Sequence, residues 1–212
     1  MDKQTLQRAV RFFTISAAAT CEGRFYIPAA VSNKHLHLSK QDAERLFGAG
    51  YEFHPKKALA QHGQFACEET LDFCGPKGTL RKIRILGPMR AETQIELSVT
   101  DCYQAGITPV IRMSGDIQGT PGGRLIGPAG EIMVDRGVLV AARHLHASTE
   151  QATVLRLTDK ETICLRKKGI RGAILQNVQV RVRPDFELEL HIDTDEANAC
   201  MIANGDLLEI VR

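Results

Sequence analysis

Short runs in which apolar and polar residues alternate are the feature that most restricts the fold of this 212-residue chain. Such alternation marks strands with one buried face, because successive side chains of a strand point to opposite sides. In the segment 94–99 the apolar side carries Ile95, Leu97 and Val99. In the segment 186–193 one side carries Phe186, Leu188, Leu190 and Ile192, and the other carries Glu187, Glu189, His191 and Asp193. Gly- and Pro-rich turns such as "SGDIQGTPGG" separate the strands, which favours a barrel or a sandwich with short helices as caps.

The chain also contains a segment that is repeated three times. The stretches "HLHLSKQDAERL", "HLHASTEQATVL" and "HIDTDEANACMI" align without gaps, so that His35, His144 and His191 share one position. The expected helix N-caps are Ser39, Ser148 and Asp195, each followed three residues later by Asp42, Gln151 or Asn198. We expect each copy to be a strand that ends in a polar pair and leads into a capped helix. Three scattered copies fit a duplicated barrel whose strand ends meet in one place.

Two of these copies contain a His-x-His pair. Residues i and i+2 of a strand share a face, so His35 and His37 present two imidazoles side by side while Leu36 turns into the core. The pair His144 and His146 repeats this arrangement around Leu145. Each pair is suited to chelating a metal such as zinc, and strand-borne polar residues can complete the shells. The candidate ligands are His35, His37, Glu96, His144, His146 and His191.

Six candidate ligands are too many for one tetrahedral structural site, so a two-metal catalytic site with open positions is the better hypothesis. Two alternatives remain open at this point. The histidines could be surface residues beside helix caps, or they could hold structural zinc. His54 and His62 lack the repeated frame and are expected to be ordinary.

Composition excludes several classes of function. The chain has 27 Lys and Arg against 25 Asp and Glu and lacks Trp, so we expect neither nucleic acid nor a membrane as a partner. No apolar run has the length of a membrane span. The six cysteines form no Cys-x-x-Cys pair, which indicates reduced thiols in a cytoplasmic protein. The stretch "FFTISAAATC" is too short and polar for an export signal.

The first residues predict a short amphipathic helix, because Leu6, Val10 and Phe13 have helical spacing. This helix could dock on its own domain or tether a partner. Elsewhere, arginines on polar strand faces suit phosphate recognition, and Ser114 could donate to an anion. There is no nucleotide P-loop and no Gly-x-Ser-x-Gly elbow. The chemistry is therefore expected to depend on metals and anion binding.

Six stretches resemble signature stretches of the PduL-type phosphate acyltransferases (phosphotransacylases) of bacterial microcompartments. They are "VSNKHLHLS", "GPKG", "LGPMR…TQIELSVTD", "RMSGDIQGTPG", "AARHLHAS" and "LELHIDTDEANA". The resemblance runs from about Val31 to the C-terminus. Two positions depart from the family pattern, Ala147 where Met is expected and His62 where Pro is common. The resemblance implies a mainly β fold of two β-barrel domains with short capping helices. The expected domains are an amphipathic helix and linker (1–23), a discontinuous first barrel (24–33 plus 142–212) and a second barrel (34–141).

The resemblance also implies roles for individual residues. One zinc ion would be held by His35, His37 and Glu96, and a second by His144, His146 and His191, although another divalent metal is an alternative. Arg90 would be catalytic and bind the attacking phosphate, helped by Gln61, Gln94, Ser114 and Arg181. The residues expected to contact CoA are Ser32, Lys57, Arg84, Leu86, His191 and Asn198.

The expected activity interconverts propionyl- or acetyl-CoA plus phosphate with acyl phosphate plus CoA, by direct attack of phosphate on the thioester. One alternative is a metal-dependent thioesterase or phosphoesterase, and another is a non-enzymatic shell adaptor with structural zinc. The N-terminal helix resembles the peptide that directs the family's enzymes to microcompartment shell or cargo proteins, as in propanediol degradation. We expect the protein to lie in the cytoplasm, in the lumen of a bacterial microcompartment. We also expect a homo-oligomer.

Overall fold

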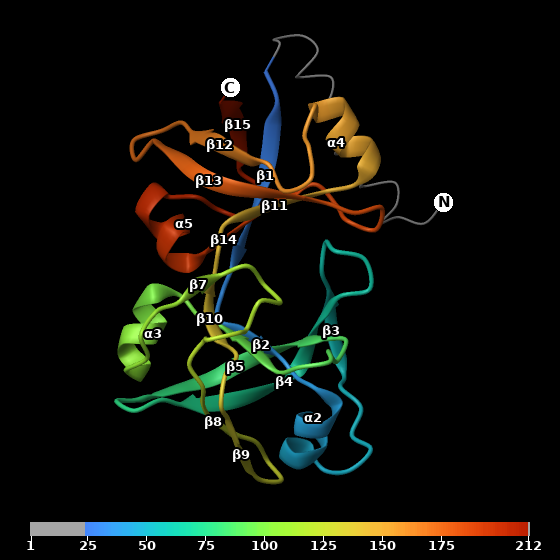
Figure 1. Ribbon diagram of the computed structural model, residues 1–212, viewed down its shortest axis with the longest axis vertical. Helices are drawn as coiled ribbons and strands as arrows, with labels where there is room; N and C mark the ends of the chain where they lie inside the picture. The colour runs from blue at the N-terminus through green and yellow to red at the C-terminus, as the bar shows by residue number, and fades with distance from the viewer. Residues whose placement is uncertain (1–23, 212) are drawn as a thin grey trace. The chain divides into compact units, whose positions relative to one another are not determined.

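The computed structural model describes residues 24–211, which form two compact units (Figure 1). The terminal unit consists of residues 24–31 and 143–211, and the central unit consists of Ser32–Ala142. The predicted N-terminal helix and linker, residues 1–23, lie outside the described residues. Each unit has its own apolar core, which Leu145 and Leu190 enter in the terminal unit and Leu36 and Ile95 in the central unit.

The terminal unit is a closed six-stranded barrel in the order β1-β14-β11-β13-β12-β15. Its strands are β1 (Tyr26–Ser32), β11 (His144–Ala147), β12 (Thr162–Lys167), β13 (Ala173–Val182), β14 (Glu189–Asp193) and β15 (Leu207–Val211). Its helices are α4 (Thr149–Leu155) and α5 (Thr194–Cys200). Each helix directly follows a strand, β11 and β14 respectively, as Figure 1 shows.

The central unit is a nine-stranded sheet in the order β7-β10-β6-β2-β5-β4-β8-β9, with β3 paired to β4. Its strands are β2 (His35–His37), β3 (Pro55–Ala58), β4 (Phe65–Cys74), β5 (Thr79–Gly87), β6 (Gln94–Glu96), β7 (Ile111–Arg112), β8 (Gly123–Ile126), β9 (Glu131–Val134) and β10 (Val138–Ala141). Its helices are α2 (Lys40–Phe47) and α3 (Val99–Ala105). The predicted mainly β class with short helices is confirmed. Within the described residues this second ladder has two ends, β7 and β9, whereas the terminal unit's ladder closes on itself.

Four strand-to-helix corners recur in the described residues, one more than the sequence comparison found. Their N-cap residues are Ser39, Ser98, Ser148 and Asp193, each of which accepts a hydrogen bond from the backbone N–H three residues later. Four residues before the cap lie His35, Gln94, His144 and Glu189, and two residues before it lie His37, Glu96, His146 and His191. The residue between these two is fully buried in every corner, because alternate side chains of a strand enter the core. Those four residues are Leu36, Ile95, Leu145 and Leu190.

The corner that ends at Asp193 corrects the gapless alignment by two residues. Asp195 was expected to be the N-cap, but Asp193 caps α5 and forms a capping box with Glu196. Asp195 instead lies in the first turn of the helix. His191 is therefore equivalent to His37 and His146, and Glu189 is equivalent to His35 and His144.

The segment 186–193 is also shorter as a strand than the alternation predicted. β14 begins at Glu189, and Phe186 lies outside it, after the turn at Pro184 and Asp185. Phe186 is buried against His146. Among residues 24–211, no helix has both the length and the apolar character needed to cross a bilayer.

Candidate metal centres

The corners bring three of the predicted ligands together in the central unit. Strands β2 and β6 pair antiparallel with His35 opposite Glu96 and His37 opposite Gln94. The potential ligand atoms of His35, His37 and Glu96 lie within 4.8 Å of one another. The Nε2 atom of His35 is 3.4 Å from Oε2 of Glu96. This spacing suits three ligands that converge on one ion.

A chain of hydrogen bonds links this cluster to Arg90. Ser114 Oγ donates to Glu96 Oε1 at 2.8 Å, and Gln94 Nε2 donates to the same oxygen at 2.6 Å. The guanidinium of Arg90 reaches Ser114 Oγ at 3.5 Å. The backbone N–H of Arg90 donates to the carbonyl of Leu38 at 2.8 Å, which fixes Arg90 beside the His-x-His strand. A guanidinium, a group suited to binding anions, thus lies next to a candidate metal site.

The protonation of His37 fits metal binding. Burial lowers the pKa of His37 to about 3, and the positive charge of Arg90 contributes in the same direction. The ring therefore stays neutral, which is the form that binds a metal. Its buried Nδ1 has no hydrogen-bond partner among the described residues. Such an orphaned buried nitrogen is costly unless a ligand satisfies it.

The terminal unit holds a second cluster at the equivalent positions. Strands β11 and β14 pair antiparallel with His144 opposite His191 and His146 opposite Glu189. The potential ligand atoms of His144, His146 and His191 lie within 4.8 Å of one another. The rings of His144 and His191 stack with centroids 5.0 Å apart.

Burial governs the chemistry of the second cluster as well. Desolvation, followed by the neighbouring His191 and His144, holds the pKa of His146 far below its usual range. Both ring nitrogens of His146 are buried without a hydrogen-bond partner among the described residues. Phe186 stacks on the His146 ring at 4.0 Å between centroids. The Arg183 guanidinium lies 5.0 Å from the Phe186 ring centroid.

The two donor sets fit zinc. Neutral imidazoles and a carboxylate are the nitrogen and oxygen ligands that zinc takes, and three protein ligands leave a position open for water or substrate. His35, His37 and Glu96 provide one such set, and His144, His146 and His191 provide the other. The orphaned nitrogens of His37 and His146 are the observation that supports this fit.

The other predicted site residues are distributed over both units. Gln94 and Ser114 bond to Glu96, and Gln61 is buried in the central unit. Arg181 lies on β13 of the terminal unit, in register with His146. Among the predicted CoA contacts, Arg84 pairs in register with His35. Ser32, Lys57 and Leu86 belong to the central unit, and His191 and Asn198 belong to the terminal unit.

Sequence reasoning assigned no role to Glu189, which lies at the second cluster. Its Oε2 atom is 3.7 Å from Nε2 of His191, and its side chain is only 12% exposed. The capping-box pattern offered a signal, because Asp193 is followed three residues later by Glu and Asp195 by Asn. Counting back from Asp193 would have matched Glu189 to the first histidine of each pair.

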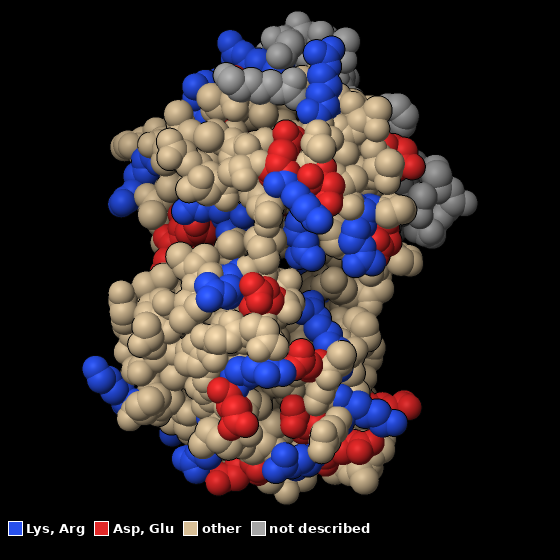
Figure 2. Space-filling view, viewed as in Figure 1, with Lys and Arg blue, Asp and Glu red and all other residues tan. Residues whose placement is uncertain are grey.

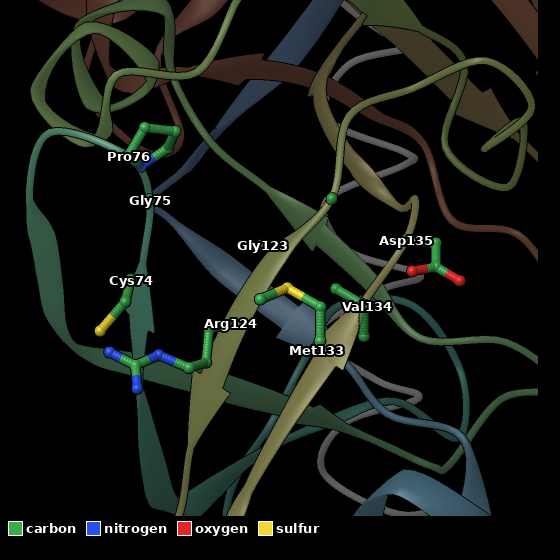
Figure 3. Close-up of a pocket in the computed structure, with 9 residues that line it drawn as sticks. Cys74, Gly75, Pro76, Gly123, Arg124, Met133, Val134 and Asp135 are labelled. Carbon is green, nitrogen blue, oxygen red and sulfur yellow. The ribbon is translucent and has the colours of Figure 1, made fainter.

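A pocket of about 500 Å³ lies elsewhere in the central unit and contains none of the predicted site residues. Its lining includes Cys74, Arg124 and Met133, and Figure 3 shows the Arg124 side chain extending toward Cys74. Arg124 also forms an exposed ion pair with Glu131 at 3.0 Å. On the face shown in Figure 2, acidic and basic side chains are interspersed, so that face carries no large single-sign patch.

Comparison with known proteins identifies the family of this chain. Residues 28–203 match the model of the phosphate propanoyltransferase family. A phosphate propanoyltransferase from Thermotoga maritima is 48% identical over 187 residues, which cover 88% of this chain and 89% of the relative. Proteins of that name from Rhodopseudomonas palustris and Salmonella typhimurium are 41% and 47% identical, covering 100% and 94% of this chain and 99% and 92% of the relatives. The chain therefore belongs to the phosphate propanoyltransferase family of acyltransferases.

Proposed function

We propose that this enzyme interconverts propionyl- or acetyl-CoA plus phosphate with the acyl phosphate plus CoA, with zinc bound at both clusters. The observation that carries the proposal is the hydrogen-bond chain from Arg90 through Ser114 to Glu96. It joins an anion-binding guanidinium to a set of metal ligands. The names of the relatives support the substrate class.

In the proposed reaction Arg90 holds inorganic phosphate by paired N–H donors, so that a phosphate oxygen faces the thioester carbonyl carbon. The phosphate oxygen bonds to the carbonyl carbon as the C=O π electrons move onto the carbonyl oxygen. The tetrahedral intermediate then collapses, the C–S bond breaks, and the CoA thiolate leaves and takes up a proton. No side chain is acylated. Gln94 and Ser114 hold the Glu96 carboxylate in place. When zinc is bound, it supplies positive charge that stabilises the developing oxyanion.

The proposed CoA contacts extend this site. Lys57 and Arg84 are exposed cations of the central unit, suited to the phosphate groups of CoA. Arg84 lies in register with His35 on the neighbouring strand, so a bound CoA would pass close to the first cluster. Acetyl and propionyl groups differ by one methylene, which an apolar pocket discriminates by only about 1–3 kcal/mol. We therefore propose that both acyl groups are accepted.

A phosphate-dependence assay tests the proposed activity. Free CoA released from acetyl- and propionyl-CoA is measured with and without inorganic phosphate, and acyl phosphate is trapped as the hydroxamate. We expect CoA release only with phosphate, in equal amount to acyl phosphate. CoA release without phosphate would identify a thioesterase instead. No release under any condition, with metal bound, would identify a non-enzymatic zinc protein.

The proposal extends to location and assembly. We propose that residues 1–23 act as an encapsulation peptide that directs a homo-oligomeric enzyme into a bacterial microcompartment. The support is the amphipathic spacing of Leu6, Val10 and Phe13. A fluorescent protein fused to residues 1–23 should co-purify with shells, whereas a fusion with these three residues changed to Asp should not. Equal co-purification of the two fusions would sink the idea.

A further inference from the structure

Each pair of corners contains one polar residue that stands beside the three candidate ligands. In the central unit this residue is Gln94, and in the terminal unit it is Glu189. Both lie four residues before the N-cap of the second corner, and both face the second histidine of the His-x-His pair across the strands. The two residues are therefore structural equivalents with different chemistry.

Gln94 shows what this position does in the central unit. Its Nε2 donates to Glu96 Oε1 at 2.6 Å and to Ser114 Oγ at 3.0 Å. Its own Oε1 accepts from the backbone N–H of Gly115 at 2.7 Å. The amide is thus anchored at one end and orients the Glu96 carboxylate at the other. The donor at position 94 therefore matches the carboxylate of Glu96, which accepts hydrogen bonds.

Glu189 stands in the same relation to His191. The two residues are i and i+2 on β14, as Gln94 and Glu96 are on β6, so their side chains share a face. Oε2 of Glu189 lies 3.7 Å from Nε2 of His191. Here the candidate ligand is an imidazole, whose second ring nitrogen is a donor when the first binds a metal. An acceptor at position 189 matches that donor.

We propose that Glu189 is the positioning residue of the second metal centre. Its carboxylate accepts a hydrogen bond from Nε2–H of His191, which fixes the ring orientation and leaves Nδ1 for the metal. The 3.7 Å separation exceeds hydrogen-bond length by about 0.5–1 Å, and the proposal requires the two side chains to move together by that amount when the metal is bound. This inference rests on the proposed function, in which His144, His146 and His191 hold a zinc ion.

Metal affinity tests the role of Glu189 without relying on activity. The 212-residue protein, Glu189→Leu and Glu189→Asp are equilibrated with zinc against chelators of graded strength, and zinc per chain is measured. Glu209→Gln is the matched control, because Glu209 is a buried carboxylate of the same barrel that pairs with Arg24 and Arg166. We expect Glu189→Leu, which has no hydrogen-bond acceptor, to weaken the binding of one of the two zinc ions about 10- to 100-fold. Glu189→Asp should recover part of that loss, and Glu209→Gln should bind both ions as the parent protein does.

The outcomes separate this inference from the proposed function. A parent protein that binds no zinc would overturn both. If the parent protein binds two ions and Glu189→Leu binds both with unchanged affinity, only the role of Glu189 is overturned. Cobalt substitution adds a spectroscopic readout. We expect cobalt-loaded Glu189→Leu to keep the visible-band intensity of the same coordination number. An intensity change that reports a lost ligand would show that Glu189 binds the metal directly and would overturn the positioning role.

Discussion

Replacing His37 with Ala should lower acyl transfer about 10³-fold and remove one of the two proposed metal ions per chain. Lewis-acid stabilisation is worth several kcal/mol, and each 1.36 kcal/mol is a factor of ten in rate. His37 is 2% exposed and shares its cluster with His35 and Glu96, so neither solvent nor a spare side chain replaces it. Zinc per chain and the rate of phosphate-dependent CoA release are the two measurements.

The matched control for His37 is His54→Ala. His54 belongs to the same unit, but its side chain is 69% exposed. Its partner Glu69 also accepts hydrogen bonds from Tyr51 Oη and from the backbone N–H of position 54, which the variant keeps. We expect His54→Ala to keep both metal ions and the parent rate. The metal ion that remains in His37→Ala reports that the terminal unit is folded. Two ions per chain in His37→Ala would remove His37 from the metal site.

Replacing Arg90 with Ala should lower kcat/KM for phosphate about 10²- to 10³-fold, the usual effect of removing one preorganised electrostatic contact to the reacting group. The KM for acyl-CoA should change little, because Arg90 is assigned to phosphate alone. The kcat/KM of Arg90→Lys for phosphate should lie between those of the parent enzyme and Arg90→Ala, since Lys keeps the positive charge but loses the planar guanidinium. Initial rates over a matrix of phosphate and propionyl-CoA concentrations give these constants separately.

Arg124→Ala is the control for Arg90. Arg124 is an exposed arginine of the same unit that lines the separate pocket (Figure 3). It pairs with Glu131. We expect its removal to leave both constants unchanged. The zinc content of Arg90→Ala is measured as well. Arg90 contacts the cluster through Ser114, so a lost zinc ion would be a second cause of a lower rate. A zinc-loaded Arg90→Ala enzyme with parent kinetics for phosphate would contradict the assignment.

The sequence predicted the class of fold and six candidate ligands because both depend on local periodicity. Alternation in "TQIELSV" and "FELELHID" identifies strands, and His-x-His on a strand places two rings on one face. Leu36 and Leu145 enter the two cores, as that spacing required. The ligand roles remain predictions, although the structure brings the six side chains into two clusters.

The sequence comparison missed one corner and misplaced another, for different reasons. The corner at Ser98 has Gln94 and Glu96 in place of a histidine pair, so an alignment anchored on His overlooks it. In "HIDTDEANA" both Asp193 and Asp195 can cap a helix, and His191 drew the alignment to the later residue. Only the capping hydrogen bonds of Asp193 and Glu196 distinguish the two. Glu189 was missed as a consequence.

By itself, the sequence determined that short strands leading into capped helices would carry imidazole pairs on one face, because spacing along a strand dictates side-chain direction. The tertiary structure decided which strand-to-helix corners pair with each other within each unit. The antiparallel registers that set Glu96 opposite His35 and Glu189 opposite His146 join strands far apart in the chain. Strand pairing of that kind depends on barrel closure and core packing, which local periodicity does not encode.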